Sequence, residues 1–210
     1  MSAVLYSFRR CPYAMRGRMG IYAAGLTYEH REVLLRDKPQ AMLDASPKGT
    51  VPVFICADGT IIEESLDLLF WALEHNDPQG WLTCDIDSAR ALIATNDGPF
   101  KHHLDRYKYA SRYKHDAKRG DTDFEHRQQA ETHLKPLEAA LRQAPYLLGE
   151  KQSVADIAIF PFIRQFANTD IEWWQMSPYP ELRDWLERHV TSSLFEAVMK
   201  KHPQWRAAED

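Results

Sequence analysis

A single cysteine stands between a short apolar run and a segment with the character of a helix. The run is Ala3–Tyr6, the cysteine is Cys11, and the helical segment begins at Pro12 and reaches Ala24. Proline suits the first position of a helix, because its φ is already helical and its missing N–H would have no partner there. Free N–H groups and the positive end of the dipole at such a helix start favour a thiolate over a thiol. The sequence therefore predicts a reactive sulfur at Cys11.

Four arginines near this cysteine strengthen that prediction. They are Arg9, Arg10, Arg16 and Arg18. Cationic side chains around a sulfur stabilise its ionised form. The alternative is a buried structural cysteine at the end of a strand, and the Cys-Pro-aromatic spacing together with the arginines favours the reactive thiol over it.

The other two cysteines give no sign of a disulfide framework. Cys56 falls inside a β-rich run and is expected to be a small core residue, whereas Cys84 falls in a loop-like stretch where oxidation is easier. An odd number of widely spaced cysteines is typical of a reducing compartment. No Cys or His pair has the spacing of a repeated ligand set, and neighbouring His102 and His103 cannot share one helical face, so we expect no metal.

The composition is that of an ordinary globular protein. The 210 residues are 44% hydrophobic and 27% charged, and 26 basic against 30 acidic side chains give a net charge of −4. This balance does not favour nucleic acid or anionic membrane as a partner. No stretch resembles a signal peptide or approaches the roughly 20 apolar residues of a membrane span, and we expect a cytoplasmic protein.

The first part of the chain predicts a small α/β domain. A strand at 3–6, the helix from Pro12 and a second strand near 28–34 form a βαβ unit with parallel strands. After a short helix at 40–45, Val51-Pro52 enters a β-rich run, and Asp58-Gly59 predicts a hairpin into a strand at 61–62. A cis bond before Pro52 would leave the backbone of Val51 facing outward for a ligand.

A helix over 66–73 closes this domain. Ser65 is its expected N-cap, and the carboxylate of Glu64 beside the helix start would suit a ligand's ammonium group, although a cap of this kind is common for structural reasons alone. Loop-like residues follow. We therefore expect one domain over 1–76, a linker over 77–85 and a second domain over 86–210.

The second domain shows helical signals only. A long helix is expected from Ile86 to about Lys114 with a break near Gly98-Pro99, and a further one up to Gln143, capped by Thr122 or Asp123. A strongly apolar helix follows Ser153-Val154-Ala155-Asp156, which has the form of a capping box. Shorter amphipathic helices over 180–190 and 194–201 complete the expected fold.

These motifs in this order resemble the cytosolic glutathione transferase superfamily. Cys11-Pro12-Tyr13-Ala14, Val51-Pro52 and Glu64-Ser65 are similar to a thioredoxin-like domain, and the internal Ser-x-x-Asp box is similar to the helical domain joined to it. A cysteine in place of a tyrosine or serine is similar to the omega class and its bacterial glutaredoxin-like relatives, as are Lys38 and Trp205. The implied fold is an N-terminal thioredoxin-like domain followed by an all-helical domain, and the implied assembly is a homodimer.

The resemblance also implies roles for individual residues. Cys11 would face the sulfur of glutathione, Val51 would pair its backbone with the cysteinyl part, Glu64 and Ser65 would hold the γ-glutamyl end, and Lys38 would approach the glycyl carboxylate. Two departures are notable. Ala14 stands where a dithiol glutaredoxin has its second cysteine, and Gln152 precedes the capping box where an apolar residue is commoner.

The stretch from Arg106 to Lys114 alternates basic and aromatic side chains and leaves three interpretations open. One face of a helix packs in the core, or Tyr107 and its neighbours wall a second-substrate pocket as the resemblance implies, or the stretch binds nucleic acid. The acidic net charge disfavours the last of these.

Three functions are compatible with these residues. The first is a glutathione-dependent thiol transferase or reductase, in which Cys11 removes glutathione from mixed disulfides and needs no resolving cysteine. The resemblance to the omega class implies that it could also reduce dehydroascorbate-like compounds. The second is glutathione conjugation to electrophiles, for which Tyr6, Ser7 or Tyr13 would supply a hydroxyl. The third is a non-catalytic interaction protein with the transferase fold, which has no need of Cys11, Glu64 and Ser65 together.

Overall fold

The computed structural model describes residues 2–207, which separate into two compact units. Unit 1 comprises the residues up to Gly80 together with those from Ser192 onward, and unit 2 is Trp81–Thr191. The linker was expected over 77–85, and the division falls within that range. The second domain was expected to continue to residue 210, but the residues from Ser192 onward group with unit 1.

Unit 1 is built on a four-stranded mixed sheet. Its strands are β1 (Val4–Ser7), β2 (Glu29–Glu32), β3 (Val53–Ile55) and β4 (Ile61–Ile62), in the order β2-β1-β3-β4. β1 runs parallel to β2 and antiparallel to β3, with Leu5 opposite both His30 and Phe54. The parallel pair and the antiparallel hairpin are those predicted from the sequence.

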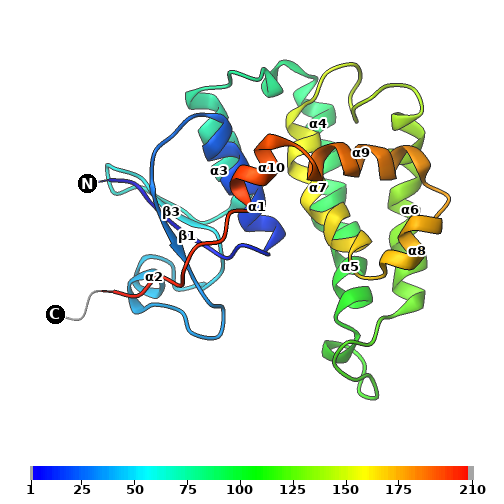
Figure 1. Cartoon of the computed structure of the whole chain (residues 1–210), viewed down its shortest axis with the longest axis horizontal. Coiled ribbons are helices and arrows are strands. Elements are labelled where there is room, and N and C mark those ends of the chain that lie inside the picture. Colours follow the sequence, from blue (N-terminus) through cyan, green and yellow to red (C-terminus); the bar gives the residue numbers. More distant parts are fainter. Residues whose placement is uncertain (1, 208–210) are drawn as a thin grey trace. The chain divides into compact units, whose positions relative to one another are not determined.

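Four helices complete this unit. They are α1 (Pro12–Ala23), α2 (Gln40–Ala45), α3 (Ser65–His75) and α10 (Ser193–Val198). Figure 1 shows α1 and α3 side by side, and two glycines of α1 permit this approach. A Cβ on Gly20 would lie 3.0 Å from Cα of Leu69, and one on Gly17 would lie 2.8 Å from a methyl of Leu68. The close packing on α3 fixes the position of α1, and Cys11 at its start packs against a cluster that includes Tyr6 and Val53.

The C-terminal segment after α10 attaches to the outer strand β2. The N–H of Trp205 donates to the carbonyl of Glu32 over 2.8 Å, and the Trp205 ring meets the ring of Tyr6 edge-on. The guanidinium of Arg31 lies 4.3 Å from the centre of the Trp205 ring. These contacts explain why the segment belongs to unit 1, although its own sequence reads only as an amphipathic helix and a tail.

Unit 2 is built of helices. Its elements are η1 (Trp81–Thr83), α4 (Ile86–Thr95), the π-helical turn η2 (Asn96–Phe100), α5 (Lys101–Lys108), η3 (Ala110–Arg112), α6 (Phe124–Leu141), α7 (Val154–Ala167), α8 (Ile171–Met176) and α9 (Pro180–Val190). The break expected near Gly98-Pro99 is a π-helical turn, and α5 ends six residues before Lys114. The helix α8 was not predicted. No helix in the described part of the chain is long and apolar enough to span a membrane.

The capping box at the start of α7 is confirmed and extended. The backbone N–H and the hydroxyl of Ser153 both donate to the fully buried carboxylate of Asp156, over 2.9 Å and 2.7 Å. The same carboxylate also accepts from the N–H of Leu147 and from the indole of Trp185. Asp156 therefore ties a loop and α9 to the central helix of unit 2.

Candidate active site

Cys11 occupies the N-cap position of α1, as the sequence predicted. Its N–H donates to the carbonyl of Phe8 over 3.0 Å, and its own carbonyl accepts from Met15 over 2.9 Å, so the residue joins the loop after β1 to the first turn. The side chain is partly exposed. Its sulfur lies 3.8 Å from the carbonyl oxygen of Val51. The first turn of α1 contains no acidic residue that would oppose an anionic sulfur.

Val51 and Pro52 stand next to this sulfur, and the bond between them is cis, as expected. Val51 precedes β3 and takes no part in the strand ladder. A cavity of about 260 Å³ opens here, lined by Tyr13, Lys48, Thr50, Val51, Pro52, Glu63, Glu64 and Ser65. The structure thus brings Val51, Glu64 and Ser65 together around one cavity, with Cys11 beside it.

Glu64 and Ser65 meet this cavity at the start of α3. The expectation that Ser65 caps the helix was wrong, because Glu64 holds the N-cap position and Ser65 is the first helical residue. The Glu64 carboxylate pairs with the ammonium of Lys48, and both side chains are well exposed. That pairing raises the pKa of Lys48, chiefly through the hydrogen bond to Glu64. Glu64 therefore already binds an ammonium group at the place where the sequence suggested one.

Ser65 is buried and is held by Arg16, one of the four arginines near Cys11 in the sequence. The guanidinium of Arg16 donates to the hydroxyl of Ser65 over 3.4 Å, and Arg16 itself is only 1% exposed. Arg16 thereby connects α1 with the start of α3. The sequence contains no pattern that shows which of these arginines point into the core.

Lys38 does not line the cavity, but it lies against the loop that leads to it. A Cβ on Gly49, whose φ of +61° suits glycine, would come within 3.3 Å of the Lys38 ammonium nitrogen. Gly49 is two residues before Val51. The structure therefore places this cation near the same loop, and its role toward a ligand stays a prediction.

Arg18 is the second buried arginine, and it organises the loop before Cys11. Its guanidinium donates to the hydroxyl of Ser7 over 2.5 Å and to the carbonyls of Phe8, Arg9 and Val198 over 3.4, 2.8 and 2.9 Å. Burial lowers the pKa of Arg18, while Glu32 and Cys11 act in the opposite direction. Because the carbonyl of Phe8 accepts from both Cys11 and Arg18, this cation helps fix where the sulfur stands.

The remaining candidates lie elsewhere. Tyr107 is 1% exposed and packs on Phe166 in unit 2, and burial raises its pKa to about 12. This position matches the packing interpretation of the basic and aromatic stretch. Burial also raises the pKa of the Cys56 and Cys84 thiols, which makes them poorer nucleophiles. Among residues 2–207 no group of three or more His, Cys, Asp or Glu side chains is arranged to hold a metal.

Comparison with protein families identifies the class to which this fold and site belong. Residues 5–81 match the glutathione S-transferase N-terminal domain, and residues 101–188 match the glutathione S-transferase C-terminal domain. The chain belongs to the glutathione S-transferase family. The predicted fold, a thioredoxin-like domain followed by a helical domain, is confirmed.

Particular relatives come from more than one class of the family. Glutathione S-transferase omega-1 of Mus musculus is 25% identical over 95% of this chain and 77% of its own length. Glutathione S-transferase U19 of Arabidopsis thaliana is 26% identical over 95% of this chain and 89% of its own length. A glutathione transferase family member from Pseudomonas fluorescens, solved with two glutathione bound, superposes with a TM-score of 0.78 at 19% identity, covering 94% of this chain and 92% of that one.

Proposed function

We propose that this transferase is a glutathione-dependent thiol transferase or reductase with Cys11 as its nucleophile. The observation that carries the proposal is the position of the Cys11 sulfur at the N-terminus of α1, beside Val51 and next to the cavity at Glu64 and Ser65. The similarity to an omega-class transferase along nearly the whole chain supports the same assignment.

The site suits glutathione in a defined orientation. The γ-glutamyl ammonium would replace Lys48 on the carboxylate of Glu64, and the adjoining carboxylate would meet Ser65 at the start of α3, where free N–H groups favour an anion. The cysteinyl part would pair with the backbone of Val51. Lys38, near Gly49, would approach the glycyl carboxylate. This orientation directs the sulfur of glutathione toward Cys11.

The chemistry then requires two exchanges. The thiolate of Cys11 attacks the glutathione sulfur of a glutathionylated substrate, the old S–S bond breaks, and the substrate leaves as a thiolate. The thiolate of a second glutathione attacks the mixed disulfide on Cys11, which releases glutathione disulfide and restores the Cys11 thiolate. Ala14 stands one turn along α1 from Cys11, so the second exchange relies on glutathione and not on a neighbouring thiol.

Conjugation of glutathione to an electrophile is the second candidate, and the observation that supports it is a tyrosine hydroxyl at the cavity. Of the three hydroxyls considered, that of Ser7 is buried against Arg18 and that of Tyr6 accepts from Arg31. Tyr13 alone of the three lines the cavity. A hydroxyl donor to the glutathione sulfur would therefore be Tyr13.

One pair of assays separates the two candidates. For Cys11→Ser we expect reduction of a glutathione mixed disulfide to fall to the uncatalysed rate, because the serine hydroxyl is not a thiolate at neutral pH. Cys56→Ser, which changes a buried thiol, should keep the activity. Full activity of Cys11→Ser with the mixed disulfide would refute the proposal, and turnover of a chromogenic aryl halide by the same variant would favour conjugation.

A further inference from the structure

The loop between β1 and Cys11 is held by two charged side chains of opposite sign. Arg18 of α1 and Glu32 of β2 are only 2% and 8% exposed. The guanidinium of Arg18 donates to the carbonyl of Arg9 over 2.8 Å, and the carboxylate of Glu32 accepts from the N–H of Arg9 over 2.7 Å. Both main-chain polar groups of a residue two positions before the thiol are therefore bound by buried side chains.

The two side chains also support each other's charge. Burial raises the pKa of Glu32, but hydrogen bonds from His30 and from the N–H of Arg9 outweigh it and hold the pKa below its ordinary value, with Arg18 adding to the effect. Burial lowers the pKa of Arg18, and the charge of Glu32 opposes that shift. A buried charge is tolerated only where it is paired and hydrogen-bonded, so the loop that supplies these bonds has a specified conformation.

The C-terminal segment 198–205 contacts both of these side chains' residues. Figure 1 shows α10 beside α1. Nε of Arg18 donates to the carbonyl of Val198 at the end of α10 over 2.9 Å. The main-chain carbonyl of Glu32 accepts from the N–H of Trp205 over 2.8 Å. The segment is therefore attached to Arg18 at one end and to Glu32 at the other.

The contacts of Arg18 depend on the shape of its guanidinium as well as on its charge. The group donates to three consecutive residues of the loop, which are Ser7, Phe8 and Arg9. The carbonyl of Phe8 accepts also from the N–H of Cys11. A lysine would keep the charge, but its ammonium has no planar fork that reaches several acceptors at once. The loop geometry is therefore specific to arginine at this position.

We propose that the C-terminal segment 198–205, acting through Arg18 and Glu32, positions the Cys11 thiol at the start of α1. Arg18 and Glu32 are positioning residues, since they act through the loop. If the loop loosens, Cys11 loses its place beside the free N–H groups of the helix start, and a smaller fraction of it is thiolate. In kinetic terms the proposal rests on the function proposed for Cys11, but the reactivity of the thiol is measurable without it.

The test measures the rate of Cys11 alkylation by iodoacetamide at pH 7 in the full-length chain, followed at that thiol by mass spectrometry. For Arg18→Lys we expect the rate to fall about tenfold, because the thiolate is the reacting form. Trp205→Pro deletes the N–H that donates to Glu32 and should lower the rate roughly threefold. Trp205→Phe, which keeps an N–H and an aromatic ring, should lower it less.

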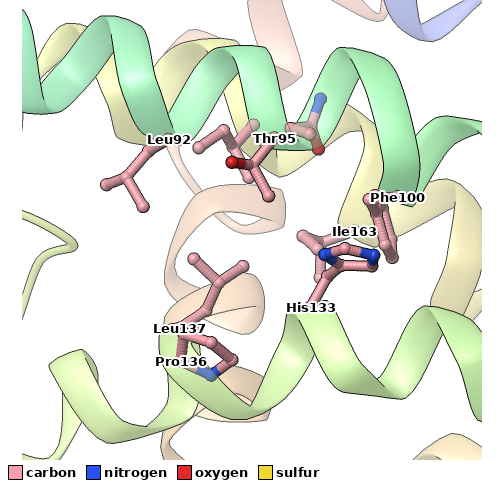
Figure 2. A pocket seen from close by; sticks show the side chains of 9 residues that line it. Leu92, Thr95, Phe100, His133, Pro136, Leu137 and Ile163 are labelled. Atoms are coloured by element: carbon pink, nitrogen blue, oxygen red, sulfur yellow. The ribbon is translucent and has the colours of Figure 1, made fainter.

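Two variants in unit 2 control for stability and for chemistry. Figure 2 shows Leu137 of α6 at a cavity of about 190 Å³, and Leu137→Ala would enlarge this cavity and destabilise the fold without changing the loop. Arg183 donates to the carbonyls of Gln175 and Ser177 over 2.7 and 2.8 Å, so Arg183→Lys repeats the loss of a guanidinium that binds main-chain carbonyls. Both variants should leave the rate at Cys11 unchanged.

A wild-type rate in Arg18→Lys or in Trp205→Pro would overturn the proposal. An equal loss of rate in Leu137→Ala or Arg183→Lys would overturn it too, because stability alone would then explain the effect. If Arg18→Lys does not fold, Trp205→Pro decides, since Trp205 is only partly buried.

Kinetics with a glutathione mixed disulfide separates this proposal from the proposed function. In Arg18→Lys kcat should fall in parallel with the alkylation rate, without an increase in the KM for glutathione, whose proposed contacts are at Glu64 and Ser65. A raised KM with an unchanged kcat would contradict the positioning role. Full activity of Cys11→Ser would refute the proposed function alone, and the alkylation rates would still decide whether the C-terminal segment positions the thiol.

Discussion

Glu64 is the residue whose proposed role is easiest to separate from structural effects. Its carboxylate is exposed and pairs with Lys48 at the surface, an interaction that contributes little to stability. For Glu64→Gln we expect the KM for glutathione to rise about tenfold with little change in kcat, because a charge-assisted hydrogen bond to the γ-glutamyl ammonium is lost. Steady-state kinetics with varied glutathione measures this.

Lys48→Met is the matched control for Glu64. It removes the partner that competes for the carboxylate, so the KM for glutathione should stay the same or decrease. An increase in KM equal to that of Glu64→Gln would assign ligand binding to the Lys48–Glu64 pair as a unit, contrary to the orientation proposed above. An unchanged KM in Glu64→Gln would remove Glu64 from the site.

The thiol itself was predictable because its signal is local. Cys11, Pro12 and the helix after them are consecutive in sequence, and the rules for helix starts apply directly to them. The support behind the thiol could not be predicted in the same way. Arg16 and Arg18 lie on α1 with buried side chains, whereas Arg10 lies in the exposed loop before the helix. No sequence pattern shows that Arg18 donates to the carbonyl of Val198.

At the scale of elements, the contact between α1 and α3 positions α1, whose N-terminal end carries Cys11. For Gly20→Ala we expect the free energy of unfolding to fall by about 1–3 kcal/mol, because the new Cβ would lie 3.0 Å from the backbone of Leu69. Alanine at an ordinary helical site would instead stabilise by up to about 1 kcal/mol. Urea denaturation followed by circular dichroism gives the sign of the change.

Gly98→Ala is the control for this substitution. A Cβ on Gly98 meets nothing within 4 Å, so its effect should stay within about 0.5 kcal/mol. Equal stability of the two variants would mean that α3 moves away freely and that the close approach does not constrain α1.

Elements with strong periodicity or clear caps were predicted well, and those set by tertiary contacts were not. The capping box gave the start of α7, and Pro180 gave the start of α9. By contrast, α8 has only six residues, too few to show a helical period. The π-helical turn at Asn96 was expected only as a break, because Gly98 and Pro99 mark an interruption without giving its form.

At the scale of the whole molecule, buried histidines should make the fold sensitive to acid. His189 of α9 is 4% exposed, and its ring stacks on Phe160 and meets Trp185 edge-on. Burial lowers its pKa to about 4, with Asp156 opposing the shift and Arg188 adding to it. Burial also lowers the pKa of His103, His126 and His133 in the same unit.

The sign of the pH dependence follows from these shifts. Below about pH 6.5 the unfolded chain binds protons that the folded chain excludes. The contribution of the neutral histidines to the free energy of unfolding is therefore fully present above this pH and decreases as the pH falls toward 4. His189 alone accounts for roughly 3 kcal/mol of that loss. The free energy of unfolding, measured by urea denaturation, should change less between pH 7 and pH 4.5 for His189→Phe than for the wild type. For the exposed His115→Gln it should change as much as for the wild type. Equal pH dependence in all three would contradict the assignment.

The division of the chain into units was the least predictable feature at this scale. The position of the boundary followed from loop-forming residues near Gly80, but the return of the C-terminal segment to unit 1 depends on Trp205, which meets Arg31 and Glu32 far away in sequence. Pairing between segments so distant leaves no local pattern.

The most direct test of the central claim is the pH dependence of Cys11 alkylation, with and without glutathione. Iodoacetamide labelling is followed at each thiol by mass spectrometry, so that Cys56 and Cys84 serve as internal references. We predict that Cys11 reacts with a midpoint well below the pKa of about 8.5 of an ordinary thiol, before the other two, and that glutathione protects it. A midpoint at or above 8.5, or labelling of Cys11 that glutathione does not change, would contradict the account.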